Sequence, residues 1–101
     1  MIIYNVTVNI DNDVAEEWLT WMQEVHIPEV MNTGMFLENR ILRVLADEDS
    51  GGKTYSIQYT CTNMDTYELY NEKFAPALRA AHTARYGSKF VAFRTLLQVV
   101  K

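Results

Sequence analysis

Cysteine, proline and glycine are scarce in this sequence, and basic clusters are absent. Its 101 residues include one cysteine, two prolines and four glycines. A single cysteine cannot form an internal disulfide, so we expect a reducing compartment, the cytoplasm. Nine Lys and Arg residues against thirteen Asp and Glu residues give a net charge of -4. Without a basic patch, nucleic acid is not an expected partner.

Long apolar runs are missing as well. No run of about 18 apolar residues occurs, so we expect no membrane-spanning segment. The apolar start of the chain has no basic residues before it and is interrupted by Asn5, Thr7 and Asn9, which is typical of a strand rather than a signal peptide. The sequence also has no GxGxxG, P-loop or Gly-x-Ser-x-Gly motif. It therefore predicts no cofactor and no serine nucleophile of the hydrolase type.

Strand and helix patterns, in contrast, follow each other regularly along the chain. Apolar residues make up 49% of the sequence, and we expect one domain over residues 1–101 that buries roughly two-thirds of its unfolded surface. Strand alternation covers residues 2–10, 36–46, 53–62 and 89–100, and helical periodicity covers residues 14–36 and 64–86. The Gly-rich segment 47–53 predicts a hairpin turn between the second and third strands.

The first helical stretch, Val14 to Phe36, carries the strongest pattern. An arc of roughly 160° holds its core-facing residues, which are Val14, Ala15, Trp18, Leu19, Trp21, Met22, Val25 and His26. Asp11 or Asp13 is expected to cap its start. We predict a break at Ile27, because the residue before a proline avoids the α conformation. Gly34 is expected to end the stretch.

The second helical stretch has similar signals. Thr62 or Asn63 is expected to cap it, Pro76 to kink or restart it, and Gly87 to end it. In the strand that follows, the more apolar set of alternate residues is predicted to face the core. That set is Val91, Phe93, Thr95, Leu97 and Val99.

The element order β-α-β-β-α-β predicts an α+β, ferredoxin-like fold. Its antiparallel sheet would have the strand order 4-1-3-2, with both helices on one face. The opposite face is predicted to carry mostly polar residues, namely Asn5, Thr7, Asn9, Ser56, Gln58, Thr60, Arg94 and Gln98. The apolar Ile3, Leu96 and either Phe90 or Val100 among them favour a covering partner, and we expect a homodimer.

Two long motifs resemble a known family. They are WxxWMxxxHIPEVMxTGxF (18–36) and FAPALRAAHTARYGSKFVAFRTLL (74–97). With them the chain resembles an uncharacterised bacterial family of small domain-of-unknown-function proteins. More distantly it is similar to the dimeric α+β barrel superfamily, which includes antibiotic-biosynthesis monooxygenase-like proteins, haem-degrading enzymes and ring-processing isomerases. The resemblance implies a ferredoxin-like dimeric barrel and assigns no catalytic residue.

His26 is the clearest candidate for chemistry. Its ordinary pKa of about 6.5 suits a general acid or base. The alternative is a structural histidine that hydrogen-bonds carbonyls freed by the proline. A two-His metal site with His82 is not expected, because antiparallel helices would separate the two residues by roughly 15 to 20 Å. The sequence also lacks CxxC and HxxxH spacings, so we predict no metal.

Several aromatic residues are expected at the same end of the molecule as His26. They are Tyr4, Trp21, Tyr59, Tyr67 and Tyr70. Such a group suits a pocket for a small apolar or aromatic molecule. The competing interpretation is packed core, since aromatic stripes at helical spacing usually pack inside.

The remaining reactive residues have plainer expected roles. Cys61 is predicted to be an inert buried thiol. Arg40 and Arg94 could face a barrel interior and bind an acid, but pairing with carboxylates such as Glu38 is the first expectation. Three functions remain open: small-molecule binding, a cofactor-independent monooxygenase- or isomerase-like enzyme, and a non-catalytic interaction or regulatory module.

Overall fold

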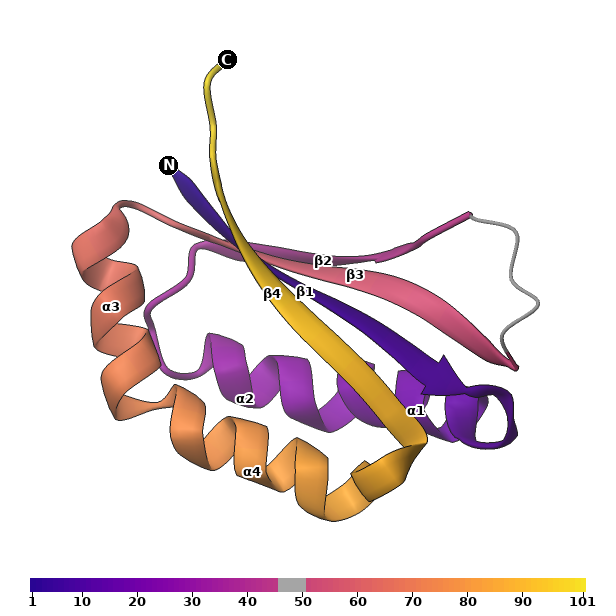
Figure 1. Ribbon diagram of the computed structural model, residues 1–101. Coiled ribbons are helices and arrows are strands. Elements are labelled where there is room, and N and C mark those ends of the chain that lie inside the picture. The colour runs from indigo at the N-terminus through magenta and orange to yellow at the C-terminus, as the bar shows by residue number, and fades with distance from the viewer. Residues whose placement is uncertain (46–50) are drawn as a thin grey trace.

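A computed structural model describes residues 1–45 and 51–101 as a four-stranded sheet with helices on one side (Figure 1). The strands are β1 (Ile2–Asp11), β2 (Glu38–Arg43), β3 (Gly52–Cys61) and β4 (Phe90–Gln98). The helices are α1 (Ala15–Trp21), α2 (Ile27–Met31), α3 (Met64–Lys73) and α4 (Ala75–Tyr86). A π-helical turn (Met22–His26) joins α1 to α2, and 3-10 turns precede α1 (Asn12–Val14) and follow α4 (Gly87–Lys89).

The sheet has the order β2-β3-β1-β4, with antiparallel pairing throughout. This is the predicted ferredoxin-like order read from the other edge. No helix in residues 1–45 or 51–101 is long and apolar enough to cross a membrane. Most of the predicted hairpin turn, residues 47–50, lies outside the described residues.

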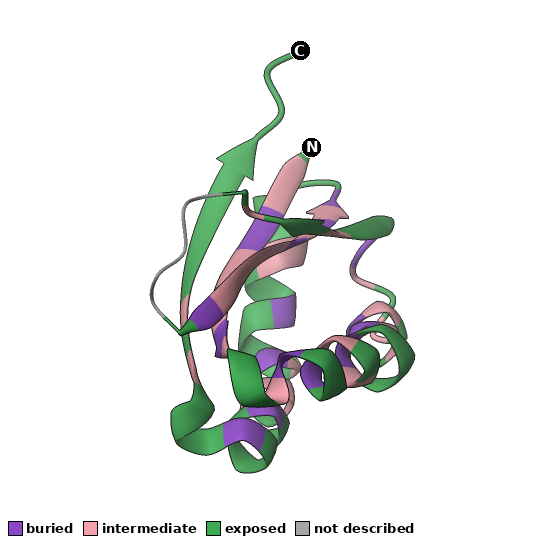
Figure 2. Ribbon diagram, turned by 90° about the vertical axis from the view of Figure 1, so that its right-hand side faces the viewer, coloured by how far each residue is buried: buried purple, intermediate pink, exposed green. Residues whose placement is uncertain are grey.

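Strand β4 presents the opposite face from the one predicted. Its register places Phe90 beside Ile10 and Arg94 beside Val6, so these β4 residues face the helices. The more apolar set lies on the open face instead, where Val91 and Phe93 are 70% and 63% exposed. Figure 2 shows β4 as mostly exposed. Alternation defines two faces, but pairing with β1 decides which one meets the core.

The predicted break at Ile27 is also wrong. Ile27 has α-helical angles, φ -60° and ψ -45°, and its N–H bonds to the carbonyl of Met22, five residues back. The ring of Pro28 would clash with a carbonyl four residues back, and the wider π turn avoids this contact. The helix therefore continues to Met31, and Gly34 (φ 77°) follows as predicted.

The capping predictions had mixed outcomes. Neither Asp11 nor Asp13 caps a helix, and the carboxylate of Asp13 instead accepts a hydrogen bond from Lys89 at 2.9 Å. Asn63 does cap α3, accepting from the backbone N–H of Thr66 at 2.9 Å.

The restart at Pro76 and the end at Gly87 (φ 50°) are confirmed. Pro76 stands in the first turn of α4, where its missing N–H leaves no hydrogen bond unmade. Helix α3 consequently lies at a clear angle to α4 (Figure 1).

The core lies between the helices and the sheet. Its fully buried large side chains are Ile10, Trp18, Val30, Ile57 and Cys61. Figure 2 shows buried positions, in purple, on both the strands and the helices.

Candidate functional site

A cluster of aromatic rings lies at one end of the core. Tyr4 packs against Phe36, Tyr59, Tyr67 and Tyr70, with ring centroids 5.2 to 6.1 Å away. Four of the tyrosines predicted from the sequence are therefore brought together. Burial raises the pKa of Tyr59 and of Tyr70, and the neighbouring tyrosines add to the effect. Their hydroxyls remain protonated at neutral pH and can donate hydrogen bonds.

Two histidines and two tryptophans form a second cluster beside the first. The ring of His26 stacks on Trp21, with centroids 4.9 Å apart, and lies 5.7 Å from the ring of His82. The indole N–H of Trp18 donates to Nε2 of His82 at 2.9 Å. The predicted separation of the two histidines is therefore wrong.

The break between α3 and α4 explains why the predicted distance between the two histidines is wrong. A continuous helix over 64–86 would place His82 far from its midpoint. Because the chain restarts at Ala75, α4 alone packs beside the first helical stretch, and His82 lies near the middle of α4. The first stretch in turn runs on past Pro28, which places His26 near the same level.

Both histidines are held uncharged. Burial lowers the pKa of His26 and of His82 to about 4, and the nearby His26 and Arg94 contribute at His82. Since Nε2 of His82 accepts a hydrogen bond, the proton of its neutral ring is on Nδ1. Nδ1 of His26 is buried and has no partner within the described chain. The predicted bond from His26 to freed helix carbonyls is not formed at this atom.

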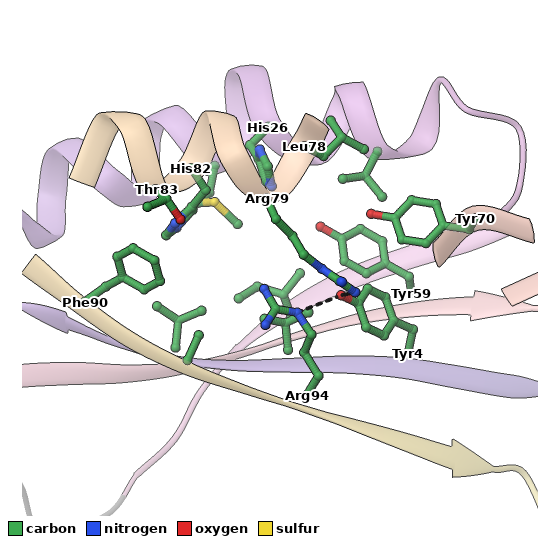
Figure 3. A pocket seen from close by; sticks show the side chains of 16 residues that line it. Tyr4, His26, Tyr59, Tyr70, Leu78, Arg79, His82, Thr83, Phe90 and Arg94 are labelled. Atoms are coloured by element: carbon green, nitrogen blue, oxygen red, sulfur yellow. Dashed lines mark hydrogen bonds between the residues drawn. The ribbon is translucent and has the colours of Figure 1, made fainter. Parts of the chain in front are cut away.

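A cavity of about 50 Å³ lies between these clusters and the sheet (Figure 3). Its polar lining residues are Tyr4, His26, Tyr59, Tyr70, Arg79, His82, Thr83 and Arg94. The rest of its wall is apolar, formed by Val6, Val8, Met22, Val30, Ile57, Leu78, Phe90 and Ala92. Of the six predicted pocket residues, Tyr4, His26, Tyr59 and Tyr70 line the cavity. Trp21 and Tyr67 instead pack behind His26 and Tyr4.

Two arginines cross the mouth of the cavity. Nη2 of Arg79, from α4, and Nε of Arg94, from β4, each donate to the hydroxyl oxygen of Tyr4 at 3.1 Å. Arg79 also donates to Oδ1 of Asn71 at 2.8 Å. Figure 3 shows both side chains converging on Tyr4. Arg94 is neither on the open face nor paired with a carboxylate, and Arg40 bonds to Gln58, so both predicted ion pairs are absent from the described structure.

Comparison with known proteins assigns the family. A family model described as a domain of unknown function, DUF4286, matches residues 1–100. The chain belongs to this family. No curated protein has a sequence that matches it.

Solved structures share the fold of this DUF4286 chain at low sequence identity. A point mutant of MhuD with two manganese protoporphyrin IX molecules bound per active site has a TM-score of 0.73 and 16% identity, over 100% of this chain and 96% of that one. A dimeric ferredoxin-like protein from an uncultured marine organism has a TM-score of 0.70 and 13% identity, over 100% of this chain and 96% of that one. A mutant of SnoaB from Streptomyces nogalater, a cofactor-independent oxygenase, has a TM-score of 0.67 and 10% identity, over 99% of this chain and 94% of that one. These likenesses establish the ferredoxin-like fold.

The DUF4286 chain offers no evident metal centre in the residues that the structure describes. No group of three or more His, Cys, Asp or Glu side chains there could hold a metal ion. Cys61 is buried, its thiol donates to the carbonyl of Asn63, and burial raises its pKa.

Sequence reasoning did not find Arg79 as a site residue. It lies outside the apolar arc of its helix, where an arginine normally points to solvent. Its role becomes visible only once β1 and β4 place Tyr4 and Arg94 within its reach.

Proposed function

We propose that this protein binds a small, mainly apolar or aromatic molecule in the cavity between its helices and its sheet. The proposal rests on a cavity with an apolar and a polar part of its wall. Two of its lining residues have buried nitrogens without a partner in the described structure, namely Nδ1 of His26 and Nε of Arg79. Unpaired buried polar atoms are costly, and a bound molecule with matching groups would remove that cost.

The volume limits what the cavity holds. An engineered apolar cavity of about 150 Å³ accommodates benzene, whereas this one has about 50 Å³. We expect one end of the ligand inside and the remainder at the opening between α4 and β4, where Thr83 and Arg94 are exposed. This arrangement suits a molecule with one small end group rather than a fully enclosed ring system.

We also propose that the protein is a homodimer in the cytoplasm. Its open sheet face carries the exposed Val91, Phe93, Leu97 and Val99 beside hydrogen-bonded polar groups such as Asn5 and Ser56. An apolar patch on an otherwise polar face favours a covering partner. The dimeric ferredoxin-like neighbour supports a second copy as that partner. The free, buried Cys61 suits a reducing compartment.

An NMR titration with benzyl alcohol tests the binding proposal. We expect shifts of the Trp18 indole N–H signal, because this group bonds to His82 in the cavity wall. Ala92→Val should weaken binding by filling the cavity, whereas Ala84→Val, on an exposed position of α4, should not. The proposal fails if the Trp18 signal does not move, or if both variants bind as the wild type does.

A cofactor-independent enzyme is the second candidate, and one observation favours it. The unpartnered Nδ1 of His26 could accept a proton from a carbon acid in the cavity. Phenylacetone in D₂O should then lose its acidic C–H signals faster with the wild type than with His26→Gln. Equal exchange rates would leave His26 a binding residue and contradict the enzymatic role.

A further inference from the structure

The mouth of the cavity has an unbalanced positive charge. Arg79 and Arg94 both line it, and the part of its lining that the structure describes includes no Asp or Glu. Among residues 1–45 and 51–101, the ion pairs involve Arg85 and Lys89, and neither cavity arginine forms one. Two guanidinium groups that meet at one hydroxyl group repel each other, so an anion placed between them would be stabilised.

The donor geometry around Tyr4 fits an anion with two oxygens. The Tyr4 oxygen already accepts from both arginines, and within the described residues its own hydrogen has no acceptor. Each guanidinium also presents further N–H groups in a planar fork that matches a carboxylate. Nε of Arg79 is buried and, among the residues described, has no partner. The site therefore offers donors from α4, β4 and β1 to one bound group.

We propose that the ligand of this cavity is a small organic acid, whose carboxylate lies between Arg79 and Arg94 while its apolar part contacts the cavity wall. This inference rests on the proposed binding function and names the class of molecule bound. Arginine forks bind phosphates as well as carboxylates, but many phosphate sites add backbone N–H groups at a helix start or in a nest. Arg79 lies inside α4 and Arg94 inside β4, away from such a start. A carboxylate is the better match.

The neutral histidines behind the arginines fit the same ligand. Because burial keeps His26 and His82 uncharged, the positive charge at the cavity comes from the two guanidiniums at neutral pH. An acid group at the mouth therefore meets the charged side chains first, and its apolar part meets uncharged rings and aliphatic groups.

Calorimetric titration with benzoate and benzamide tests the inference, because these molecules share a shape and differ in charge. We expect benzoate to bind at least about tenfold more tightly than benzamide, as a charge-assisted bond predicts. Arg79→Gln and Arg94→Gln should each remove most of this preference, and Arg94→Lys should retain part of it. Arg85→Gln, which changes an exposed arginine of the same helix outside the cavity, should leave it unchanged.

The alternative outcomes separate the two proposals. Equal binding of benzoate and benzamide would support a ligand cavity and overturn the acid preference. Binding of neither molecule would count against the cavity function itself and so against this inference. Tighter binding of phenylphosphate than of benzoate would overturn the carboxylate assignment. A preference that survives in both glutamine variants, with their thermal unfolding unchanged, would show that these arginines do not hold the acid.

Discussion

At the scale of single residues, the His82 side chain connects the core to the candidate site. It accepts a buried hydrogen bond from Trp18 on one side and lines the cavity on the other. It also contacts Phe90 edge-on, with ring centroids 4.3 Å apart. The same side chain thus fixes the position of α4 against α1 and helps shape the cavity.

Replacing His82 should therefore lower stability. His82→Leu would leave the buried indole N–H of Trp18 without an acceptor, which costs about 1–3 kcal/mol in the free energy of unfolding. His82→Gln keeps an acceptor and should cost less. Urea unfolding of the two variants measures the difference, and a Leu variant as stable as the Gln variant would show that the Trp18 bond contributes little.

The two histidines also predict a pH dependence of stability. Their pKa is lowered from 6.5 to about 4 on folding. Between these values the unfolded chain binds more protons than the folded one, so the free energy of unfolding should fall as the pH drops from 6.5 towards 4. Urea unfolding across this range should show a shallower fall for the double variant His26→Gln, His82→Gln. An identical slope in both proteins would mean that other groups cause the pH dependence.

At the scale of elements, the two prolines show why the sequence predicts some features and not others. Both obey the same rule against an internal helical proline. Pro76 satisfies it by standing in the first turn of a new helix, as predicted. Pro28 satisfies this rule through the π turn that precedes it, and no local sequence pattern predicts that turn. We attribute the choice between the two solutions to the packing of the whole domain.

Deletion of the exposed Gln23 tests the role of the π turn. Removing one residue restores ordinary α-helical spacing and brings the Pro28 ring against a carbonyl, at a cost of about 3 kcal/mol in the free energy of unfolding. Adding Pro28→Ala to the deletion should recover most of that loss, as chemical denaturation would show. If Pro28→Ala recovers nothing, the π turn exists for a reason other than the proline.

Some residues of the candidate site can likewise be predicted from the sequence, and others depend on packing of the whole domain. Four of its residues, Tyr4, His26, Tyr59 and Tyr70, follow from topology, because strand and helix ends place them at one level. Arg94 lies on the face opposite to the predicted one, because the apolar set of β4 is the exposed one. The proposed dimer interface on the open face would reverse the usual link between apolar character and the monomer core, and one sequence does not reveal such a reversal.

At the scale of the whole molecule, the open sheet face and the cavity lie on opposite sides of the sheet. Outward-facing β4 residues such as Phe93 belong to the proposed dimer face, while their neighbours Ala92 and Arg94 line the cavity. The two functions thus share one strand. A substitution on the open face of β4 is therefore expected to affect ligand binding in the cavity, and the reverse.

A charge on the open face should prevent the proposed dimer. Phe93→Lys would bring two like charges together and remove apolar contacts in the interface. Such an interface must bury about 1,000 Å² or more. Sedimentation should show a dimer for the wild type and a folded monomer for this variant. Leu69→Lys, on α3 and 40% exposed, is the control and should remain dimeric. A monomeric wild type would contradict the dimer.

The cavity between helices and sheet is proposed to bind a small organic acid. Crystals soaked with 4-bromobenzoate test it most directly, because the anomalous signal of bromine locates the ring. We expect a bromine peak at the opening of the cavity between α4 and β4, with the carboxylate against Arg79 and Arg94. A bromine peak elsewhere with the cavity unchanged, or no peak at a saturating concentration, would contradict the claim.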